Sequence, residues 1–580
     1  KTPALSPTGD CKPFSETADG TLLGEGIAMV AMKRLEDAER DGDRIYAVLK
    51  GLGSASDGRA NSVYAPLPEG QARSLRRAYE AAGYGPETVE LVEAHGTGTK
   101  AGDAAEFAGL KLAFGNPREP QWCALGTVKS QIGHTKAAAG AAGLFKAVMA
   151  LHHKVLPPTI KIDKPNPKLE IEKSPFYLNT TRRPWIRDAA HPRRASVSSF
   201  GFGGSNFHVT LEEYIPAGNG KQAWKLRAMP TELVLLGAAN AGELVSKAKA
   251  LVASKQDLVE AARATQLSFK VSDTVRLAIV AASTEELAEK LNAAIATIEK
   301  APGTAYSTPN GTHYVTGAAD AGQVAFLFPG QGSQYVGMGA EVAMAFDEAR
   351  LAWDRASNVS FGAERLHDVV FPKPVFTDAD RDAQQKKLTQ TEWAQPALGV
   401  HSQSLANVLH TLGLKPNAVA GHSFGEVMAL HEAGALDAEA LVKVARKRGE
   451  LMRDAAASTQ GAMTAVAKPI DEVKAAVAAS GANVVVANHN SPNQVVLSGS
   501  VQEIEKVEAA LSAKGMTAKR LPVATAFHSP LVAGSSVPFK AFLDGVAVKS
   551  PSLDVFANAT AAAYPKEAGA IREQLASQLA

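Results

Sequence analysis

The sequence lacks the features that mark secreted, membrane-spanning and nucleic-acid-binding proteins. Its 580 residues include only two cysteines, Cys11 and Cys123, too few for a disulfide framework, which predicts a reducing, cytoplasmic location. No apolar run reaches the roughly 18 residues of a membrane span, and we expect no signal peptide before Lys1. Because the formal net charge is only +2, we expect neither a nucleic-acid partner nor binding to an anionic membrane.

The chain is too long for one hydrophobic core, and its length suggests three or four domains. Its patterns divide into three α/β parts. We place them at residues 1–213, 214–322 and 323–580. The chain starts without methionine in a turn-rich stretch and stops within a helical pattern. We therefore expect it to be a piece of a longer protein.

The clearest chemical signal lies in the third part, where Gly421 and Gly425 bracket Ser423. A short apolar run enters this G-x-S-x-G pattern and a helical segment follows it. That order is typical of a nucleophile elbow, a tight strand-to-helix turn that exposes a serine hydroxyl. The N–H groups that open the helix would face the charge that develops beside the serine. The pattern alone is equally compatible with a serine in a surface loop.

Two histidines near predicted strand ends form a second candidate site. Residues 89–93 have the pattern of a buried strand and lead into His95-Gly-Thr-Gly-Thr99. Residues 124–128 have the same pattern and lead into Lys129-Ser-Gln-Ile-Gly-His134. A single histidine is more often structural, but two in this arrangement could stabilise one developing oxyanion.

These motifs, together with Gly201-Phe-Gly-Gly-Ser-Asn206, resemble the C-terminal half of a beta-ketoacyl synthase with the thiolase fold. The resemblance implies that His95 and His134 bind a thioester carbonyl and promote decarboxylation of a malonyl thioester, supported by Lys129. It also implies positions along the substrate for three further residues, with Thr97 and Thr99 beside the phosphopantetheine arm and Phe202 at the gate of the acyl pocket. Ketosynthases of this family are dimers, so a homodimer is expected through the complete domain.

The family's nucleophile is a cysteine in the N-terminal half, and no such motif occurs here. Cys11 matches a loop of the family that lies downstream of the nucleophile, and Cys123 is predicted to lie in the core. We therefore expect no condensation of acyl and malonyl units by this chain alone. The segments Gly102-Asp-Ala-Ala-Glu106 and Tyr64-Ala-Pro-Leu-Pro-Glu-Gly-Gln71 resemble the ketosynthases of polyunsaturated fatty acid synthases. At the position of Gly143, some related enzymes carry a glutamate that pairs with the lysine. Because this chain has glycine there, the sequence does not identify a partner for Lys129.

The middle part has the pattern of a small α/β spacer. Residues 233–236 and 275–282 are predicted strands, each followed by a predicted helix, and Ser283 with Glu286 forms a capping box before the second helix. Four apolar residues then recur at helical spacing, namely Leu287, Leu291, Ile295 and Ile298. We assign no catalytic residue here, and the part resembles the linker between the ketosynthase and acyltransferase of megasynthases.

The third part combines a glycine-rich loop with an inserted subdomain. Residues 324–328 are a predicted strand that leads into Gly330-Gln-Gly-Ser-Gln334, which lacks the Lys-Ser/Thr of a nucleotide-binding loop. The N–H groups of this loop are better suited to half of an oxyanion hole. Between about 459 and 525 the strand and helix patterns follow the order β-α-β-β-α-β, which predicts a ferredoxin-like insert.

Together with Arg448 and Ala526-Phe-His528, the glycine-rich loop and the elbow resemble the malonyl-CoA:acyl-carrier-protein transacylases. The resemblance implies an α/β-hydrolase-like parallel sheet that carries the ferredoxin-like insert. We expect the family's last strands to lie beyond Ala580, together with the residue that orients the histidine.

The residue types indicate acyl transfer. Ser423 would attack a malonyl thioester while His528 accepts its proton, and the N–H groups of Gln331 and Phe424 would hold the tetrahedral oxyanion. Arg448 offers a planar fork to the free carboxylate of malonate, which a lysine could meet only as a point charge.

The resemblance also implies the substrates, malonyl-CoA and the 4'-phosphopantetheine of an acyl carrier protein, with no directly bound cofactor and no metal. Phe527 would crowd the α-methyl of methylmalonate, so we expect a leaky preference for malonyl. We expect His422 and His489 to be structural, and two asparagines, Asn488 and Asn490, could line the pocket. A serine esterase and an inactive scaffold remain alternatives.

Overall fold

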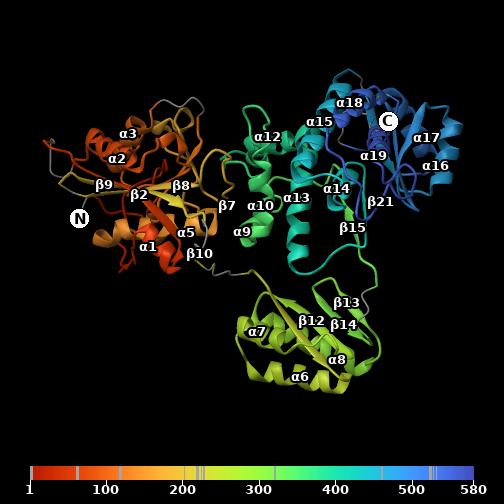
Figure 1. Ribbon diagram of the computed structural model, residues 1–580, viewed down its shortest axis with the longest axis horizontal. Helices are drawn as coiled ribbons and strands as arrows, with labels where there is room; N and C mark the ends of the chain where they lie inside the picture. Colours follow the sequence, from red (N-terminus) through yellow and green to blue (C-terminus); the bar gives the residue numbers. More distant parts are fainter. Residues whose placement is uncertain are drawn as a thin grey trace. The chain divides into compact units, whose positions relative to one another are not determined.

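The computed structural model describes residues 4–59, 65–115, 120–201, 203–216, 221–223, 225, 229–318, 322–458, 461–521, 526, 528–530 and 532–579. The chain forms two compact units, shown as ribbons in Figure 1. One unit combines an N-terminal block, Lys1–Lys225, with a C-terminal block, Ala325–Ala580, and the other is Leu226–Val324.

The N-terminal block is built on a six-stranded mixed sheet. Its strands run in the order β2 (Ala47–Ser56), β9 (Ser205–Glu213), β8 (Arg194–Gly201), β3 (Leu91–Glu93), β4 (Cys123–Gly126) and β6 (Phe176–Leu178). Strands β8, β3, β4 and β6 are parallel, and the helices α2 (Pro68–Ala82), α3 (Lys100–Phe114) and α5 (Ala139–His153) pack around the sheet. Separate apolar cores therefore lie against this sheet, one containing Phe107 and the other Ala147.

The parallel strands β3 and β4 bring the two histidine loops to the same edge of the sheet. Their register pairs Glu93 with Gly126, so the loops that follow leave the sheet side by side. Helix α5 approaches this edge closely, because a Cβ at Gly143 would lie 3.1 Å from Val197 Cγ1 and 3.2 Å from Glu93 Cγ. A glutamate at position 143 would therefore need its neighbours to move.

The unit Leu226–Val324 is a four-stranded antiparallel sheet with three helices. The strand order is β11 (Glu232–Ala238), β12 (Val275–Ala281), β14 (Thr312–Thr316) and β13 (Tyr306–Thr308), with α6 (Ala241–Ser254), α7 (Leu258–Ser268) and α8 (Thr284–Lys300). Ser283 Oγ accepts the N–H of Glu286 at 3.2 Å, as the capping box predicts. The unit starts later than residue 214 because β10 (Lys221–Gln222) pairs with β1 (Arg44–Ile45) of the N-terminal block.

The C-terminal block has a three-stranded parallel sheet at its centre. The strand order is β15 (Ala325–Phe328), β16 (Ala418–Gly421) and β21 (Asp554–Phe556). The helices α10 (Asp347–Ala356), α13 (Thr391–Thr411), α14 (Gly425–Glu432), α15 (Ala438–Ser458) and α19 (Ala568–Ser577) belong to the same block. Trp353, Phe424 and Leu441 lie in their shared apolar core.

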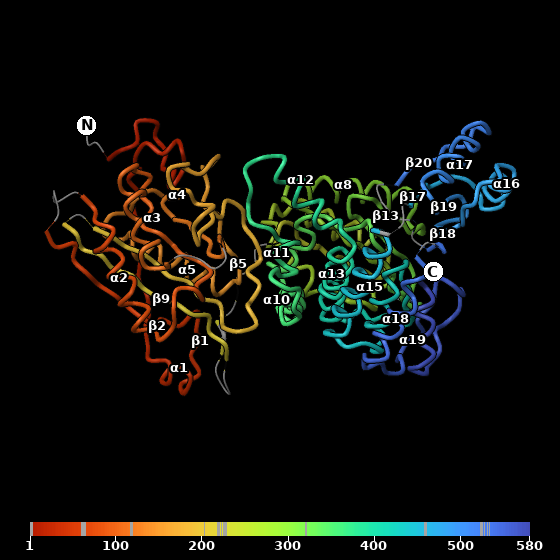
Figure 2. The backbone as a smooth tube through the Cα atoms, turned by 90° about the horizontal axis from the view of Figure 1, so that it is seen from above, coloured from red at the N-terminus to blue at the C-terminus, as the bar shows by residue number. Residues whose placement is uncertain are grey.

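An inserted subdomain follows α15. Its elements run in the order β17 (Gly461–Val466), α16 (Ile470–Ser480), β18 (Val484–Ser491), β19 (Gln494–Ser500), α17 (Val501–Ala513) and β20 (Ala518–Arg520). The antiparallel sheet has the order β18-β19-β17-β20, and Figure 2 shows these elements gathered at one end of the C-terminal block. The predicted α/β fold class, with a parallel sheet carrying a ferredoxin-like insert, is confirmed.

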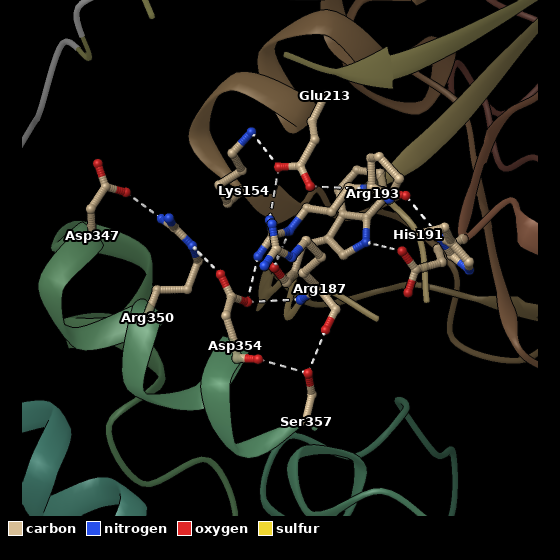
Figure 3. Close-up of polar contacts among 12 residues, drawn as sticks. Lys154, Arg187, His191, Arg193, Glu213, Asp347, Arg350, Asp354 and Ser357 are labelled. Carbon is tan, nitrogen blue, oxygen red and sulfur yellow. Dashed lines mark hydrogen bonds and ion pairs between the residues drawn. The ribbon is translucent and has the colours of Figure 1, made fainter. Parts of the chain in front are cut away.

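A buried ionic network joins the N-terminal and C-terminal blocks (Figure 3). The guanidinium of Arg193, 2% exposed, lies 2.8 Å from Glu213 Oε2 and 2.6 Å from Asp354 Oδ1 of α10. Asp354 Oδ1 also accepts the backbone N–H of Arg187 at 2.8 Å, and Lys154 pairs with Glu213 at 2.8 Å. Each buried charge therefore has an opposite charge as a neighbour, which compensates part of its desolvation.

Two ion pairs that join these blocks, one buried and one exposed, should contribute very differently to the free energy of unfolding. Asp354→Ala should lower the free energy of unfolding by about 3 kcal/mol, because it leaves part of the buried Arg193 guanidinium without an acceptor. Glu341→Ala, which removes the exposed pair with Arg182, should leave the unfolding midpoint nearly unchanged. Urea unfolding followed by tryptophan fluorescence measures both variants, and equal midpoints would contradict the prediction.

Candidate active site

The G-x-S-x-G segment forms the strand–turn–helix that its sequence predicts. Strand β16 ends at Gly421, helix α14 begins at Gly425, and Ser423 between them has φ +53°. A Cβ on Gly421 would lie 1.9 Å from the carbonyl carbon of Gly425, and one on Gly425 would lie 2.2 Å from Phe328 O. Only glycine therefore allows the turn to close, and the turn holds the serine in the left-handed region that non-glycine residues rarely adopt.

Ser423 and His528 are in direct contact. Ser423 Oγ lies 2.8 Å from His528 Nε2, and His528 Nδ1 lies 3.1 Å from the carbonyl oxygen of Gln578. Because a carbonyl can only accept, Nδ1 carries the ring proton and Nε2 is free to accept the serine proton. Burial first, and then the charge of Arg448, lower the pKa of His528 to about 4, so the imidazole is neutral near neutral pH.

The group that orients the histidine lies within the chain, and our expectation that it lies beyond the end of the chain is wrong. Gln578, just after α19, supplies the carbonyl oxygen that accepts from His528. Its side-chain Nε2 also donates to Ser423 O at 2.7 Å. Sequence reasoning missed this residue because a backbone carbonyl has no side-chain signature.

Arg448 of α15 places a buried guanidinium beside the serine. Its side chain is 1% exposed, and its Nη2 lies 3.3 Å from Ser423 Oγ and 3.2 Å from Gln578 Oε1. Nη1 donates to Gln395 Oε1 at 3.0 Å, and Nε has no hydrogen-bond partner among the described residues. Burial lowers the pKa of Arg448 to about 10, which still leaves the group charged.

No carboxylate in the described part of the chain lies within ion-pair distance of Arg448. The buried carboxyl of Glu426 raises the pKa of Arg448 through its charge, an effect smaller than that of burial. A buried cation without a paired anion is costly in a folded protein. The arrangement therefore suits an anionic group that enters the site with the substrate.

The two predicted oxyanion donors come from two different loops, the one after β15 and the turn at Ser423. Gln331 lies in the loop after β15, and this loop packs on the elbow, because a Cβ at Gly330 would lie 2.6 Å from His422 O. The N–H of Phe424 opens α14. Neither N–H is bonded to another described group, whereas Ser423 N–H donates to Asn558 Oδ1 at 2.7 Å. Gln331 and Phe424 therefore stay the candidate donors.

The insert contributes two asparagines to the elbow. Asn490 Oδ1 lies 3.0 Å from His422 Nε2, and Asn488 Nδ2 lies 3.4 Å from the same atom. The contacts give the imidazole of His422 polar partners outside the Ser423–His528 pair. Phe527, the predicted determinant of malonyl over methylmalonyl, lies outside the described residues.

The N-terminal block brings His95 and His134 together. Their ring centroids are 5.3 Å apart and the rings are nearly perpendicular. His95 Nδ1 accepts the N–H of Phe200 at 3.4 Å, and His134 Nδ1 accepts the N–H of Lys136 at 3.0 Å. In each ring the proton is therefore on Nε2. The two Nε2–H groups could both donate to one acceptor placed between the rings.

Burial keeps both histidines neutral. It lowers the pKa of His95 well below its usual value and that of His134 to about 4, and the nearby charge of Lys129 adds to both effects. Lys129 is 3% exposed and burial lowers its pKa. No ion pair with Lys129 occurs among the described residues, and the carboxylate of Glu93 pairs with Lys146 at 2.9 Å.

Buried carboxylates hold the loop that carries His95. Glu106 accepts the backbone N–H groups of His95 and Gly96, each at 2.7 Å. Thr99 caps α3 by accepting the N–H of Gly102 at 3.2 Å, and its hydroxyl lies 2.9 Å from that of Thr97. These threonines therefore have structural contacts in addition to the substrate role that we predict for them, and Phe202 lies outside the described residues.

Neither cysteine has the character of a nucleophile. Cys11 and Cys123 are free and buried, and burial raises the pKa of both thiols, which disfavours the reactive thiolate. Within the described ranges, no group of three or more His, Cys, Asp or Glu side chains is arranged to hold a metal ion. None of the described helices is both long enough and apolar enough to span a bilayer.

Four family models match the chain. They are "Beta-ketoacyl synthase, N-terminal domain" at residues 1–38, "Beta-ketoacyl synthase, C-terminal domain" at 46–163, "Ketoacyl-synthetase C-terminal extension" at 165–266 and "Acyl transferase domain" at 325–557. Residues 1–38, which we placed with the C-terminal half, thus match the N-terminal model. The acyl transferase match contains Ser423, Arg448 and His528.

The chain is also similar to individual proteins. The chain is 36% identical to a polyunsaturated fatty acid synthase polypeptide of Thraustochytrium sp., over 98% of the chain but only 21% of that protein. It is 32% identical to the solved malonyl CoA-acyl carrier protein transacylase of Coxiella burnetii, over 44% of the chain and 79% of that structure, with a TM-score of 0.41. The acyl transferase domain of ZmaA is 24% identical over 60% of the chain and 78% of that structure, with a TM-score of 0.50.

The low pKa of His528 predicts an unusual pH profile for the reaction of Ser423 with a fluorophosphonate probe. The neutral imidazole is the proton acceptor, so the labelling rate should stay flat from pH 8 to about 5 and fall only towards about 4. Arg448→Gln removes a positive neighbour and should move this fall to higher pH. A parent profile that falls near pH 6.5, the ordinary value for histidine, would contradict the prediction.

Proposed function

Because the chain belongs to the ketosynthase–acyltransferase region of the polyketide and polyunsaturated fatty acid synthases, we propose that its acyltransferase domain moves malonyl groups from CoA to an acyl carrier protein. Ser423 carries the malonyl group as an ester between the two thioesters. The observation that supports malonate is the guanidinium of Arg448, buried beside the serine hydroxyl with no carboxylate partner among the described residues.

The first half-reaction acylates the serine. Arg448 binds the free carboxylate of malonyl-CoA through two hydrogen bonds, which fixes the thioester carbon near Ser423 Oγ. The oxygen attacks this carbon while its proton passes to His528 Nε2, and the N–H groups of Gln331 and Phe424 hold the oxyanion. The intermediate collapses by breaking the C–S bond, and the CoA sulfur takes the proton from His528.

The second half-reaction returns the malonyl group to sulfur. The phosphopantetheine thiol of the carrier protein gives its proton to His528 and attacks the seryl ester carbon. The C–O bond then breaks, and Ser423 regains its proton from the imidazole. The carbonyl oxygen of Gln578 stabilises the imidazolium at Nδ1–H in both half-reactions.

Arg448 distinguishes this proposal from a serine esterase. An esterase for neutral acyl groups gains nothing from a buried guanidinium and bears the full desolvation cost of the charge. A transferase for malonate recovers that cost when the carboxylate pairs with the arginine. We also propose malonyl over methylmalonyl, from the bulk of Phe527, and a reducing cytoplasmic location, which fits the two free thiols.

The N-terminal block suits the condensation step of the same synthase. We propose that His95 and His134, as two Nε2–H donors, hold the thioester oxygen during decarboxylation, with Lys129 tuning their charge. Thr97 and Thr99 would follow the phosphopantetheine arm, and a homodimer would form through the complete ketosynthase. The nucleophilic cysteine would come from outside these 580 residues, because both thiols here are buried.

Incubation with malonyl-CoA tests the covalent step. The parent protein should gain one malonyl group, measured by intact-protein mass, and pass it to an added carrier protein. Ser423→Ala should gain none, because no other hydroxyl contacts His528 Nε2 among the described residues. Ser577→Ala changes an exposed serine and should react like the parent. Steady thioester hydrolysis without an adduct would instead favour the esterase.

Arg448→Ala tests the choice of acyl group. Malonyl transfer should fall by about 100-fold or more, since a lost hydrogen bond between buried charges is worth on the order of 3 kcal/mol. Transfer from acetyl-CoA should be retained or increased. Arg453→Ala, on the same helix but half-exposed beside Asp454, serves as the matched control. Retained malonyl selectivity in Arg448→Ala would remove the arginine from substrate recognition.

A further inference from the structure

The backbone of Ser423 is held on both sides by side-chain amides. Its N–H donates to Asn558 Oδ1 at 2.7 Å, and its carbonyl oxygen accepts from Gln578 Nε2 at 2.7 Å. These partners lie 135 and 155 residues further along the chain. The peptide groups of the nucleophile are therefore bonded to two distant elements as well as to the turn itself.

The amide of Asn558 spans the turn. Besides accepting from Ser423, it donates from Nδ2 to the carbonyl oxygen of Gly421 at 2.8 Å. Asn558 follows β21, which runs parallel to β16 with Ala420 opposite Phe556. One side chain from the loop after the neighbouring strand thus bonds both to the last residue of β16 and to the nucleophile.

The backbone of Asn558 is itself held by a hydrogen bond to a buried glutamate. Its backbone N–H donates to Glu426 Oε1 at 2.6 Å, and Tyr564 OH donates to Glu426 Oε2. Glu426 is fully buried in the first turn of α14. The loop after β21, the first turn of α14 and the turn at Ser423 therefore form one hydrogen-bonded network.

The hydrogen bonds of this network hold the elbow in its strained backbone conformation. A non-glycine residue at φ +53° persists only where its surroundings determine the backbone strongly. Gly421 and Gly425 allow the turn to close, but they do not hold it closed. The bond to Asn558 also occupies Ser423 N–H, which leaves the N–H groups of neighbouring residues to bind an oxyanion.

We infer that Asn558 is a positioning residue, which locks the strained turn so that Ser423 Oγ points at His528 Nε2. The inference rests on the proposed acyl transfer at Ser423, and it assigns the amide no contact with substrate. Gln578 fixes the opposite side of the same peptide, but its contacts with Arg448 and His528 make Asn558 the cleaner position to test.

The test compares Asn558→Ala and Asn558→Asp with the parent in the full 580-residue chain. Four quantities are measured: the rate at which a fluorophosphonate labels Ser423, the kcat for malonyl transfer, the KM for malonyl-CoA, and the thermal midpoint. Thr560→Ala, which changes a hydroxyl in the same loop that bonds only Ala562 N among the described groups, is the matched control.

Asn558→Ala should lower both labelling and kcat by about 100-fold, the typical effect of misplacing a reacting group by roughly 1 Å. The KM for malonyl-CoA should change little, because Arg448 is untouched. Asn558→Asp keeps the acceptor for Ser423 N–H but loses the donor to Gly421 O, so its labelling rate should lie between those of Asn558→Ala and the parent.

Labelling of Asn558→Ala at the rate of Thr560→Ala would overturn the inference. If Asn558→Ala does not fold, Asn558→Asp decides, because labelling at the parent rate would overturn the inference and a slower rate with an unchanged thermal midpoint would support it. A parent protein that reacts with the probe but not with malonyl-CoA would refute only the proposed transfer. The labelling rates of the Asn558 variants, relative to the parent, would still test the positioning role of Asn558.

Discussion

The candidate site in the C-terminal block depends on one buried cation, the guanidinium of Arg448 beside Ser423 Oγ, which has no carboxylate within ion-pair distance among the described residues. Burial of this group is unfavourable until an anion arrives, and its neighbours Gln395 and Gln578 supply only neutral oxygens. The same charge contributes to the low pKa of His528, second to burial. A single cation thus prepares the site for an acidic acyl group and keeps the general base unprotonated.

Two neutral-histidine sites in the chain use opposite tautomers. At His528 a carbonyl oxygen bonds Nδ1, so Nε2 is a proton acceptor suited to a nucleophilic hydroxyl. At His95 and His134 backbone N–H groups bond Nδ1, so Nε2 is a donor suited to an oxyanion. In both sites burial beside a cation, Arg448 or Lys129, keeps the imidazole neutral. The chemistry of each ring is therefore set by its backbone partner.

Local patterns in the sequence predicted much of the fold and part of the site. The G-x-S-x-G turn, the capping box at Ser283 and the β-α-β-β-α-β insert depend on neighbouring residues, so they can be read from short segments. The convergence of Ser423, His528 and Arg448 came from resemblance to a family, because the contacts join residues that lie 25 and 105 positions apart. The sequence could not show Asn558 or the carbonyl of Gln578, whose contacts depend on how β21 and α19 pack. The buried Arg193–Asp354 pair between the two blocks has no periodic signal either.

The structure of the protein after reaction with malonyl-CoA would test the central claim most directly. We expect the malonyl group on Ser423 Oγ, with both carboxylate oxygens about 2.7–2.9 Å from the guanidinium nitrogens of Arg448. A seryl ester whose carboxylate points into solvent or binds another residue, with the guanidinium of Arg448 still bonded only to its neutral neighbours, would contradict it.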